Sequence, residues 1–582
     1  MIKSDLSIMI SGQAGDGILF TGDLLAKIFK RTGLEVFTHR DFPSNIRGEP
    51  TAYTIRASEK KIYGPSDEAD ILVAFDCELI SRHLPKVNKE GFVICDHFEK
   101  QRLNSSLEKE KIFFNIPIRK LARDYFRREI FKNVITLGIL SYFLQLELDL
   151  AAEVIEEIFL QRKGKEVVDK NIRALELGKK EVERVIKENY RIQLPTKEDL
   201  NRLLITGDEA VALGALTAGC RFFSGYPICP ASEIMEWLVR ILPKYNGVVV
   251  QVEDEIAAIH MTLGASYAGA RAMTATSGPG FSLMSEGLSL AGMAEIPIVI
   301  VYVQRLGPST GMPTKSEQGD LNHSLFAGHG DFPRIVISPA TIEDCFYLTA
   351  ESFNLAEKFQ CPVILLTEQL YAQNYQTVEK FDFSQIKIDR GKLITSEELI
   401  SQNEFLRYKF TKDGVSPRTI PSMSNGIHMV EGNEHSESGY RDESPENRKK
   451  MMEKRMRKLK AALNYLPQPF LSGSEEAKIG IIGFGSTFGA IQEVKNILGE
   501  RNLPIQTLHL RTLWPLSQDT IKNFISSKKK VFIAEHNATG QLCHLLHLVT
   551  GPNSKLKSIR KFDSQPFRIR EIVERIEEEI KR

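Results

Sequence analysis

Three consecutive carboxylates near the middle of the chain are its first candidate for acid–base chemistry. The apolar segment 248–252 is typical of a buried strand, and Glu253, Asp254 and Glu255 follow it where a helix is expected to begin. Acids at a helix N-terminus stabilise the helix by about 0.3–1 kcal/mol, and this effect is sufficient to explain the presence of Glu253 and Asp254. One carboxylate held at a strand end is also placed to hydrogen-bond a ring nitrogen of a cofactor.

Three further loops follow strands or precede helices and carry polar, glycine-rich or proline-rich sequence. Arg305 comes after the apolar run IPIVIVYV. At the end of such a strand, an arginine guanidinium is well placed to bind a substrate carboxylate through two hydrogen bonds. The tight loop 276–281 is glycine-rich, and the loop 225–233 (GYPICPASE) is expected to be rigid, with Ser232 capping the next helix. A surface arginine and a plain loop with a cap are the structural alternatives. Three loops converging on one edge of a parallel sheet favour a ligand site.

A glycine-rich turn near the N-terminus is a weaker candidate. Gly12, Gly15 and Gly17 lie between an apolar strand and an amphipathic helix, where backbone N–H groups and the helix N-terminus favour an anion. Tight packing is the structural alternative. The spacing of Gly15-Asp16-Gly17 from Asn45 formally resembles a signature that holds Mg²⁺ and thiamine diphosphate, but the intervening sequence is typical of an irregular loop, so this interpretation is not favoured.

Alternating apolar strands and amphipathic helices predict an α/β protein, with parallel pairing of strands. Three successive α/β domains are expected, at residues 1–190, 200–385 and 471–582, separated by a linker and charged insertion at 386–470. The clearest predicted strands and helices are at residues 6–10, 18–31, 51–56, 71–75, 91–95, 137–144, 151–188, 208–218, 233–242, 248–252, 272–276, 298–303, 363–366, 479–483, 505–510, 530–534 and 569–581.

The insertion has a charged character of its own. Residues 431–446 are acidic and residues 448–460 are strongly basic. Met452, Met456, Leu459 and Leu463 are spaced as one apolar stripe of a helix, which predicts an exposed loop followed by a docked helix. A nucleic-acid patch is the alternative, and the lack of interleaved aromatic residues disfavours it.

The composition limits the class of protein. The net charge of +1 gives no electrostatic reason to expect nucleic acid, and no apolar run approaches the roughly 20 residues that a membrane helix needs. Seven scattered cysteines without a CxxC pair give no sequence support for a zinc site, an iron–sulfur cluster or a disulfide framework. We therefore expect a soluble, cytoplasmic, multidomain protein with no metal site of its own.

Several motifs together resemble a known family. YPICPASE, QVEDEIAAIH, TATSGPGFSLMSEG and VQRLGPSTGMPTKSEQGDL are similar to the α subunit of 2-oxoacid:ferredoxin oxidoreductases. GQAGDGILFTGDLLAK with RDFPSNIRG resembles the γ domain of the same enzymes, fused ahead of α. GNEH followed by ESPENRKKMMEKRMRKL is most similar to the 2-oxoglutarate branch, and KVFIAEHNATGQL resembles the transketolase-C-terminal-like domain. The resemblance implies a Rossmann-like γ domain, a pyrimidine-binding domain and a transketolase-like domain.

What the resemblance implies is one half of an enzyme. It would oxidatively decarboxylate 2-oxoglutarate with CoA to succinyl-CoA, CO₂ and reduced ferredoxin. Thiamine diphosphate would be shared with a β subunit, which would hold Mg²⁺ and the 4Fe–4S cluster in an (αβ)₂ assembly. Carried over by position, Glu255 would bond the pyrimidine ring and Arg305 would clamp the substrate carboxylate. The other implied residues are Tyr226, Pro227, Ile228, Cys229, Pro230 and Thr314 for the substrate, Ser277, Gly278 and Gly280 for the cofactor, and Gly12, Gly15, Gly17 and Arg47 for CoA or another anion.

The chain departs from the family pattern at three positions. Cys229 stands where the family has threonine, Glu49 replaces the second glycine after Arg47-Gly48, and Asp16 replaces the usual glutamine of the glycine turn. Two other functions stay open beside the one above. They are a pyruvate or broad-range 2-oxoacid oxidoreductase, and a non-catalytic paralogue that binds a β-like chain; intact Glu255 and Arg305 argue against the paralogue.

Overall fold

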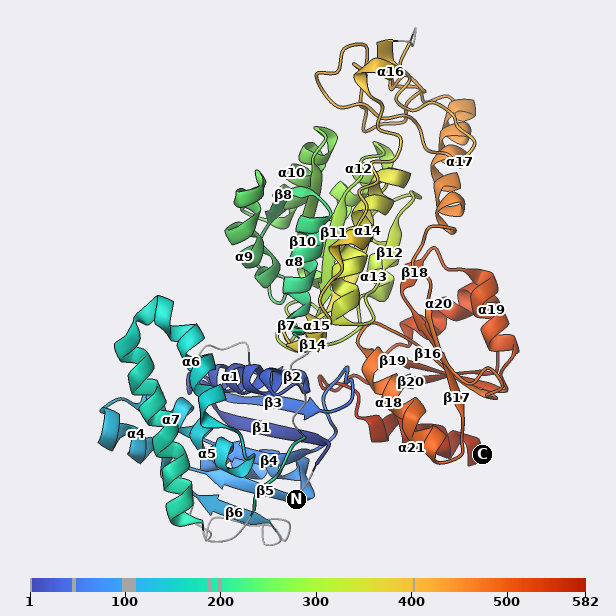
Figure 1. Ribbon diagram of the computed structural model, residues 1–582. Helices are drawn as coiled ribbons and strands as arrows, with labels where there is room; N and C mark the ends of the chain where they lie inside the picture. The colour runs from blue at the N-terminus through green and yellow to red at the C-terminus, as the bar shows by residue number, and fades with distance from the viewer. Residues whose placement is uncertain are drawn as a thin grey trace. The chain divides into compact units, whose positions relative to one another are not determined.

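The chain divides into two compact units, which are described separately. The computed structural model describes residues 3–43, 49–96, 111–186, 190–195, 201–400 and 404–581. The N-terminal unit comprises residues 1–205 together with the short segment 374–380, and the second unit comprises residues 206–373 and 381–582. Figure 1 shows the helices and strands of each unit. Among the described residues, no helix is both long and apolar enough to cross a membrane.

An eight-stranded mixed sheet forms the centre of the N-terminal unit, as far as the structure describes it. Strands β1, β4, β5 and β6 run parallel, whereas β3 is antiparallel to both β1 and β2. The expectation of parallel pairing is therefore wrong at one side of this sheet. The strands, in sheet order, are β6 (Ile112–Asn115), β5 (Val87–Cys95), β4 (Ala69–Ala74), β1 (Asp5–Gln13), β3 (Pro50–Ser58), β2 (Glu35–Asp41), β14 (Gln376–Val378) and β7 (Leu203–Ile205).

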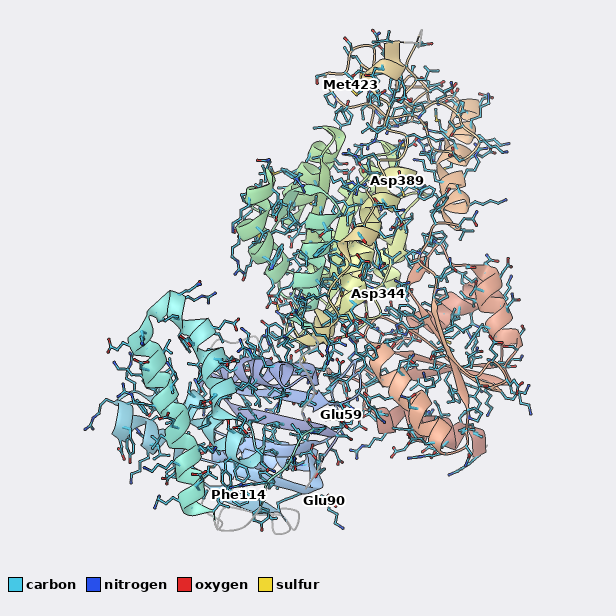
Figure 2. The ribbon with its side chains drawn as sticks, viewed as in Figure 1. Glu59, Glu90, Phe114, Asp344, Asp389 and Met423 are labelled. Carbon is cyan, nitrogen blue, oxygen red and sulfur yellow. The ribbon has the colours of Figure 1, made fainter. Side chains whose placement is uncertain are left out.

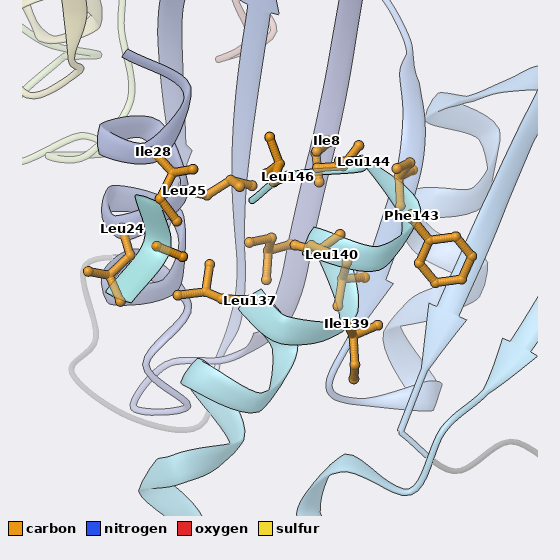
Figure 3. Close-up of a cluster of buried hydrophobic side chains, with 14 of the residues drawn as sticks. Ile8, Leu24, Leu25, Ile28, Leu137, Ile139, Leu140, Phe143, Leu144 and Leu146 are labelled. Carbon is orange, nitrogen blue, oxygen red and sulfur yellow. The ribbon is translucent and has the colours of Figure 1, made fainter. Parts of the chain in front are cut away.

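The core of the N-terminal unit lies between this sheet and its helices. Figure 3 shows Ile8 of β1, Leu25 of α1 and Leu140 of α5 meeting in one buried cluster. The helix predicted at 151–188 is two helices, because Gly164 adopts a left-handed φ of 80° and ends the first. The helices are α1 (Ile18–Arg31), α2 (Ile80–His83), α4 (Ile118–Phe126), α5 (Lys132–Phe143), α6 (Leu148–Lys163) and α7 (Lys165–Val185).

The second unit contains a seven-stranded sheet that is parallel except at one edge, within the described residues. Its strands, in sheet order, are β18 (Thr512–Trp514), β12 (Ile335–Ile337), β13 (Val363–Glu368), β11 (Val299–Gln304), β10 (Arg271–Thr276), β8 (Cys220–Gly225) and β9 (Val248–Gln251). The accompanying helices are α8 (Gly207–Thr217), α9 (Ser232–Ile241), α10 (Glu255–Tyr267), α11 (Gly278–Leu283), α12 (Ser285–Met293), α13 (Leu321–Phe326), α14 (Ile342–Phe359) and α15 (Gln369–Ala372).

A five-stranded sheet in the described C-terminal residues completes the second unit. Arg511 donates two hydrogen bonds, of 2.6 and 2.9 Å, to Asp344 of α14, which is labelled in Figure 2, and so ties this part to the seven-stranded sheet. The prediction of α/β structure in three successive parts of the chain is thereby confirmed. The strands and helices are β15 (Phe470–Gly473), β17 (Ile505–Leu510), β16 (Ile479–Phe484), β19 (Lys530–Glu535), β20 (Leu556–Arg560), α18 (Thr487–Glu500), α19 (Gln518–Ser526), α20 (Gln541–Thr550) and α21 (Ile569–Lys581).

The charged insertion contains α16 (Ser396–Ile400) and the long helix α17 (Pro445–Ala462). The docked helix was predicted, but the prediction of its buried face was wrong, because Met452, Met456 and Leu463 do not lie on that face. Lys454 and Lys458 are buried instead and form ion pairs of 2.7 and 2.5 Å with Glu295. A buried carboxylate thus makes a basic helix face compatible with the protein interior.

Candidate active site

The loops singled out in the sequence lie at one edge of the seven-stranded sheet. Strands β9, β8, β10 and β11 are consecutive neighbours and all parallel, so their carboxyl ends point to the same side. The loops after these strands carry the carboxylates, the GYPICP segment, the SGPG turn and Arg305, in that order. The structure therefore brings the four segments together, as the topology of parallel strands requires.

The three consecutive carboxylates have three different environments. Asp254 is the N-cap of α10, and its Oδ1 accepts a 2.8 Å hydrogen bond from the Ala257 N–H. Glu253 is exposed. Glu255 is only 4 % exposed, and burial raises the pKa of its carboxyl. Helix capping therefore accounts for Asp254 and leaves Glu255 as the buried carboxyl that local structure does not explain.

The SGPG turn after β10 packs directly on this carboxyl. A Cβ atom on Gly280 would collide with the Glu255 Oε1 atom and with Thr276, so only glycine allows this approach. The Ser277 hydroxyl is completely buried and has no hydrogen-bond partner among the described residues. A buried acid, a buried hydroxyl and two glycines lie together at this edge, so a flat polar ring placed there would contact Glu255, Ser277, Gly278 and Gly280.

Arg305 is buried and fixed in direction. Its side chain is 7 % exposed, and its two terminal nitrogens donate to the carbonyls of Cys229, at 2.5 Å, and Thr310, at 3.3 Å. Its Nε–H is buried without a partner in the described chain. An unpaired buried donor costs about 1–3 kcal/mol, which a carboxylate ligand would relieve. Arg305 is therefore a buried arginine, and the alternative of a surface arginine is wrong.

The GYPICP loop forms the wall beside Arg305. Tyr226 and Pro227 are exposed, Ile228 and Cys229 are half-buried, and Pro230 is buried. The Cys229 thiol donates to the Pro313 carbonyl at 3.3 Å, and burial raises its pKa to about 11, so it is a neutral thiol.

Two more residues complete the description of this wall. Thr314, one position beyond the carbonyl that accepts from Cys229, is also buried. The prediction that Ser232 caps α9 is wrong, because Ala231 is the N-cap and makes no side-chain cap.

A hydrogen-bonded group of three residues, Asp320, Tyr302 and His323, was not predicted from the sequence. The Tyr302 hydroxyl is 3.1 Å from His323 Nδ1 and hydrogen-bonded to Asp320, which interacts electrostatically with Arg305. The available signal was Asp320 within SEQGDL, just before a short helix. An aspartate in that position suggests an ordinary N-cap, so no pattern marked it as unusual.

The N-terminal glycine turn is occupied by a side chain of its own. The Asp16 carboxylate accepts from the Gln13 N–H at 3.0 Å and from Arg119 at 3.2 Å, and it forms an ion pair with Lys132. Burial opposes the charge, but these partners lower the pKa of Asp16 overall. Gly12, Gly15 and Gly17 frame this carboxylate, whereas Arg47 lies outside the described residues.

Comparisons with known proteins define the class first. Residues 213–454 match the family "Pyruvate flavodoxin/ferredoxin oxidoreductase, thiamine diP-bdg", and residues 7–181 match "Pyruvate ferredoxin/flavodoxin oxidoreductase". The edge carrying Glu255 and Arg305 therefore belongs to a thiamine-diphosphate-binding domain of an oxidoreductase. No group of three or more His, Cys, Asp or Glu side chains suited to a metal ion occurs among the described residues.

The relatives then define the family. A 2-oxoacid:ferredoxin oxidoreductase α subunit of Sulfurisphaera tokodaii is 32 % identical over 97 % of this chain and 96 % of its own length. A 2-oxoglutarate synthase subunit KorA of Methanothermobacter thermautotrophicus is 34 % identical over 64 % of this chain and 97 % of its own.

Among solved structures, 2-oxoglutarate:ferredoxin oxidoreductase from Magnetococcus marinus is similar with a TM-score of 0.93 and 36 % identity, covering 99 % of this chain and 100 % of that one. The chain belongs to the α subunits of 2-oxoacid:ferredoxin oxidoreductases that carry a fused γ domain at the N-terminus. The predicted family is confirmed.

Proposed function

We propose that this chain, together with a β subunit, oxidatively decarboxylates 2-oxoglutarate with CoA to succinyl-CoA, CO₂ and reduced ferredoxin. The Magnetococcus marinus structure, which holds 2-oxoglutarate, coenzyme A and succinyl-CoA and matches nearly the whole chain, is the main support. Residues 1–190 would be the γ domain, 200–385 the pyrimidine-binding domain, 386–470 the linker and 471–582 the transketolase-C-terminal-like domain.

The roles of the residues follow from their environments. When bound, thiamine diphosphate would supply the nucleophile and the electron sink that decarboxylation of a 2-oxoacid requires. Glu255 would hold a proton at the pyrimidine ring, since its buried carboxyl is the acid nearest the SGPG turn. Arg305 would receive the substrate C1 carboxylate on its Nε edge, because both terminal nitrogens are already engaged. The wall from Tyr226 to Pro230, with Thr314, would line the substrate.

The partner is proposed from the surface around this site. Tyr226, Ile256, Met261 and Leu283 are 39–49 % exposed on or next to the loops and helices that carry Glu255 and the SGPG turn. Exposed apolar side chains beside an incomplete site are typical of a protein interface. We propose that a β subunit with Mg²⁺ and a 4Fe–4S cluster covers it, giving an (αβ)₂ assembly that reduces ferredoxin.

The N-terminal turn is proposed as a CoA contact. Gly12, Gly15 and Gly17 are residue types that allow a ligand to approach the backbone closely, but Asp16 already supplies the negative charge that the turn favours. CoA would therefore have to displace Asp16 or use Arg47, and loss of CoA affinity in Arg47→Ala tests the second route.

A substrate panel tests the proposal. The reconstituted complex should give its highest kcat/KM with 2-oxoglutarate, compared with pyruvate and 2-oxoisovalerate. A broad-range enzyme is the second candidate, because a full-length relative at 32 % identity carries the general name 2-oxoacid:ferredoxin oxidoreductase. Similar kcat/KM values for all three acids would favour it. A complex that binds thiamine diphosphate but turns over none of them would instead be a non-catalytic paralogue.

A further inference from the structure

A third carboxyl, that of Asp320, lies between the two walls of the candidate site. Its Oδ2 is 3.1 Å from the position that a Cβ on Gly278 would occupy, on the turn whose other glycine packs against Glu255. On its other side Asp320 interacts electrostatically with Arg305. The carboxyl therefore borders both the proposed cofactor wall and the proposed substrate wall.

Local structure does not explain this carboxyl. Asp320 occupies the N-cap position of α13, yet its side chain makes no cap hydrogen bond, although aspartate is among the preferred caps. The carboxyl instead accepts from the Tyr302 hydroxyl, which is 3.1 Å from His323 Nδ1. The Tyr302 ring stacks on Phe281 with centroids 4.5 Å apart. The side chain thus bonds to Tyr302 of β11 instead of capping its own helix.

The backbone couples Asp320 to the arginine. Its N–H donates to the Gln304 side-chain oxygen at 3.1 Å, and Gln304 directly precedes Arg305 at the end of β11. Asp320 and Arg305 nevertheless form no direct ion pair among the described residues. Because the two side chains interact electrostatically, an anion bound to Arg305 would also act on the Asp320 carboxyl.

We propose that Asp320 is a positioning residue that competes electrostatically with the substrate carboxylate for Arg305 and takes up a proton when the 2-oxoacid binds. The inference rests on the proposed function, since it requires Arg305 to receive the substrate carboxylate. The step moves one proton from solvent to the Asp320 carboxylate and breaks no covalent bond of the substrate.

The direction of the effect follows from the charges that face Asp320. Burial raises the pKa of its carboxyl to about 6, against the Tyr302 hydrogen bond and the Arg305 charge, which lower it. Glu317, which interacts electrostatically with Asp320, also has a raised pKa, chiefly from burial. His323 has a lowered pKa, again from burial, and is neutral near pH 7.

Substrate binding should therefore be linked to protons. Above pH 6 Asp320 is ionised in the free site, and a carboxylate arriving at Arg305 both cancels the arginine charge and adds a like charge. Both changes raise the pKa of Asp320, so the site takes up a proton and substrate binding weakens as pH rises above 6.

The first test measures KM and kcat of the αβ complex for 2-oxoglutarate between pH 5.5 and 8.5. We expect the parent KM to rise about three- to tenfold from pH 6 to pH 8, and Asp320→Asn to flatten this rise to within about twofold. Tyr302→Phe removes a hydrogen bond to the ionised form of Asp320, so the inflection of KM against pH should move to higher pH. Glu317→Gln, a matched change of a neighbouring acid, should keep the pH-dependent rise.

The second test measures proton uptake without turnover. The probe is 2-hydroxyglutarate, which keeps both carboxylates and lacks the oxo group, titrated calorimetrically into the αβ complex in buffers of different ionisation enthalpy. We expect uptake of about half a proton per site near pH 6.5 in the parent and close to none in Asp320→Asn.

The outcomes separate this inference from the proposed function. If Arg305→Ala leaves KM unchanged, the proposed placement of the substrate is wrong. If Arg305→Ala raises KM strongly while Asp320→Asn keeps the parent slope and proton uptake, only the role of Asp320 is wrong. Should Asp320→Asn fail to assemble, absence of proton uptake in the parent, or an unmoved inflection in Tyr302→Phe, would still overturn the inference.

Discussion

Two glycine-rich turns in this chain follow a strand and precede a helix, yet they differ in whether the nearby carboxylate is paired with a cation. In the N-terminal turn, Asp16 is held by a backbone N–H, Arg119 and Lys132. At the SGPG turn, the Ser277 hydroxyl and the nearby Arg305 Nε are buried without partners in the described chain. Both turns leave buried polar atoms without partners in the described chain, Ser11 Oγ and Asn133 Oδ1 at the first and Ser277 Oγ at the second. The comparison teaches that glycine content permits close approach at both turns, whereas charge pairing separates them: Asp16 is paired with two cations, and Glu255 forms no ion pair among the described residues.

The largest expected effect is at the second turn. Glu255→Gln in the reconstituted complex should lower kcat by about 10²–10⁴-fold, because a positioned acid–base group contributes on that scale. Glu253→Gln and Asp254→Asn should cost much less, since Glu253 is exposed and asparagine also caps a helix. Steady-state rates of the three variants check this, and equal losses would show that the wrong carboxylate was chosen.

Arg305→Ala should lower kcat/KM by about 10–100-fold, because hydrogen bonds to charged groups contribute about 1.5–3 kcal/mol. Arg305→Lys should recover only part, since an ammonium cannot copy the planar fork. The exposed Arg240 of α9 provides a control, and Arg240→Ala should leave the rate unchanged. If kcat/KM of Arg305→Ala stays within about twofold of the parent for every 2-oxoacid, Arg305 does not bind the substrate.

Asp16→Asn tests the other side of the comparison, where the expected loss is in stability. Removing the charge should destabilise the turn by about 1–3 kcal/mol. The pKa of Asp16 is lowered in the folded chain, so its stabilisation is complete above about pH 4 and is lost as pH falls through the folded pKa. Hydrogen exchange of the backbone amides of α1 and α5 in the full chain measures this loss of stability. Asp124→Asn on the exposed side of α4 is the control, and equal exchange in both variants would contradict the prediction.

The smallest expected effect is at Cys229. Cys229→Thr replaces a neutral thiol that donates to the Pro313 carbonyl with a hydroxyl that makes the same bond more strongly. The enzyme should keep kcat/KM for 2-oxoglutarate within about threefold and change the order of its preference among 2-oxoacids. A substrate panel with both proteins decides this, and a tenfold loss for all acids would mean that the loop tolerates only the thiol.

Much of the local structure was predictable from the sequence. Helices α1 (Ile18–Arg31) and α21 (Ile569–Lys581) have the predicted bounds, because their amphipathic periodicity is strong and a glycine precedes the first. The loops at the candidate site were found for a similar reason. Apolar strands followed by glycine, proline and polar residues are local patterns, and parallel topology then brings their ends together.

Two of the failures share one cause, which is that the partner lies far away in the sequence. The buried face of α17 could not be recognised as cationic without Glu295, which lies more than 150 residues earlier. The short strand β14 (Gln376–Val378) was missed because its neighbours are β2 and β7, and three residues carry little periodicity.

The sequence by itself determined the α/β class, the family and the identity of the loops at the candidate site, because short-range pattern and motif carry that information. Only the tertiary structure decided which acid is buried, that Arg305 keeps one donor unpaired, and that Asp320 faces the site instead of capping its helix. Burial, hydrogen-bond satisfaction and pKa depend on every group that packs around a side chain, and those groups come from strands and helices that are distant in the sequence.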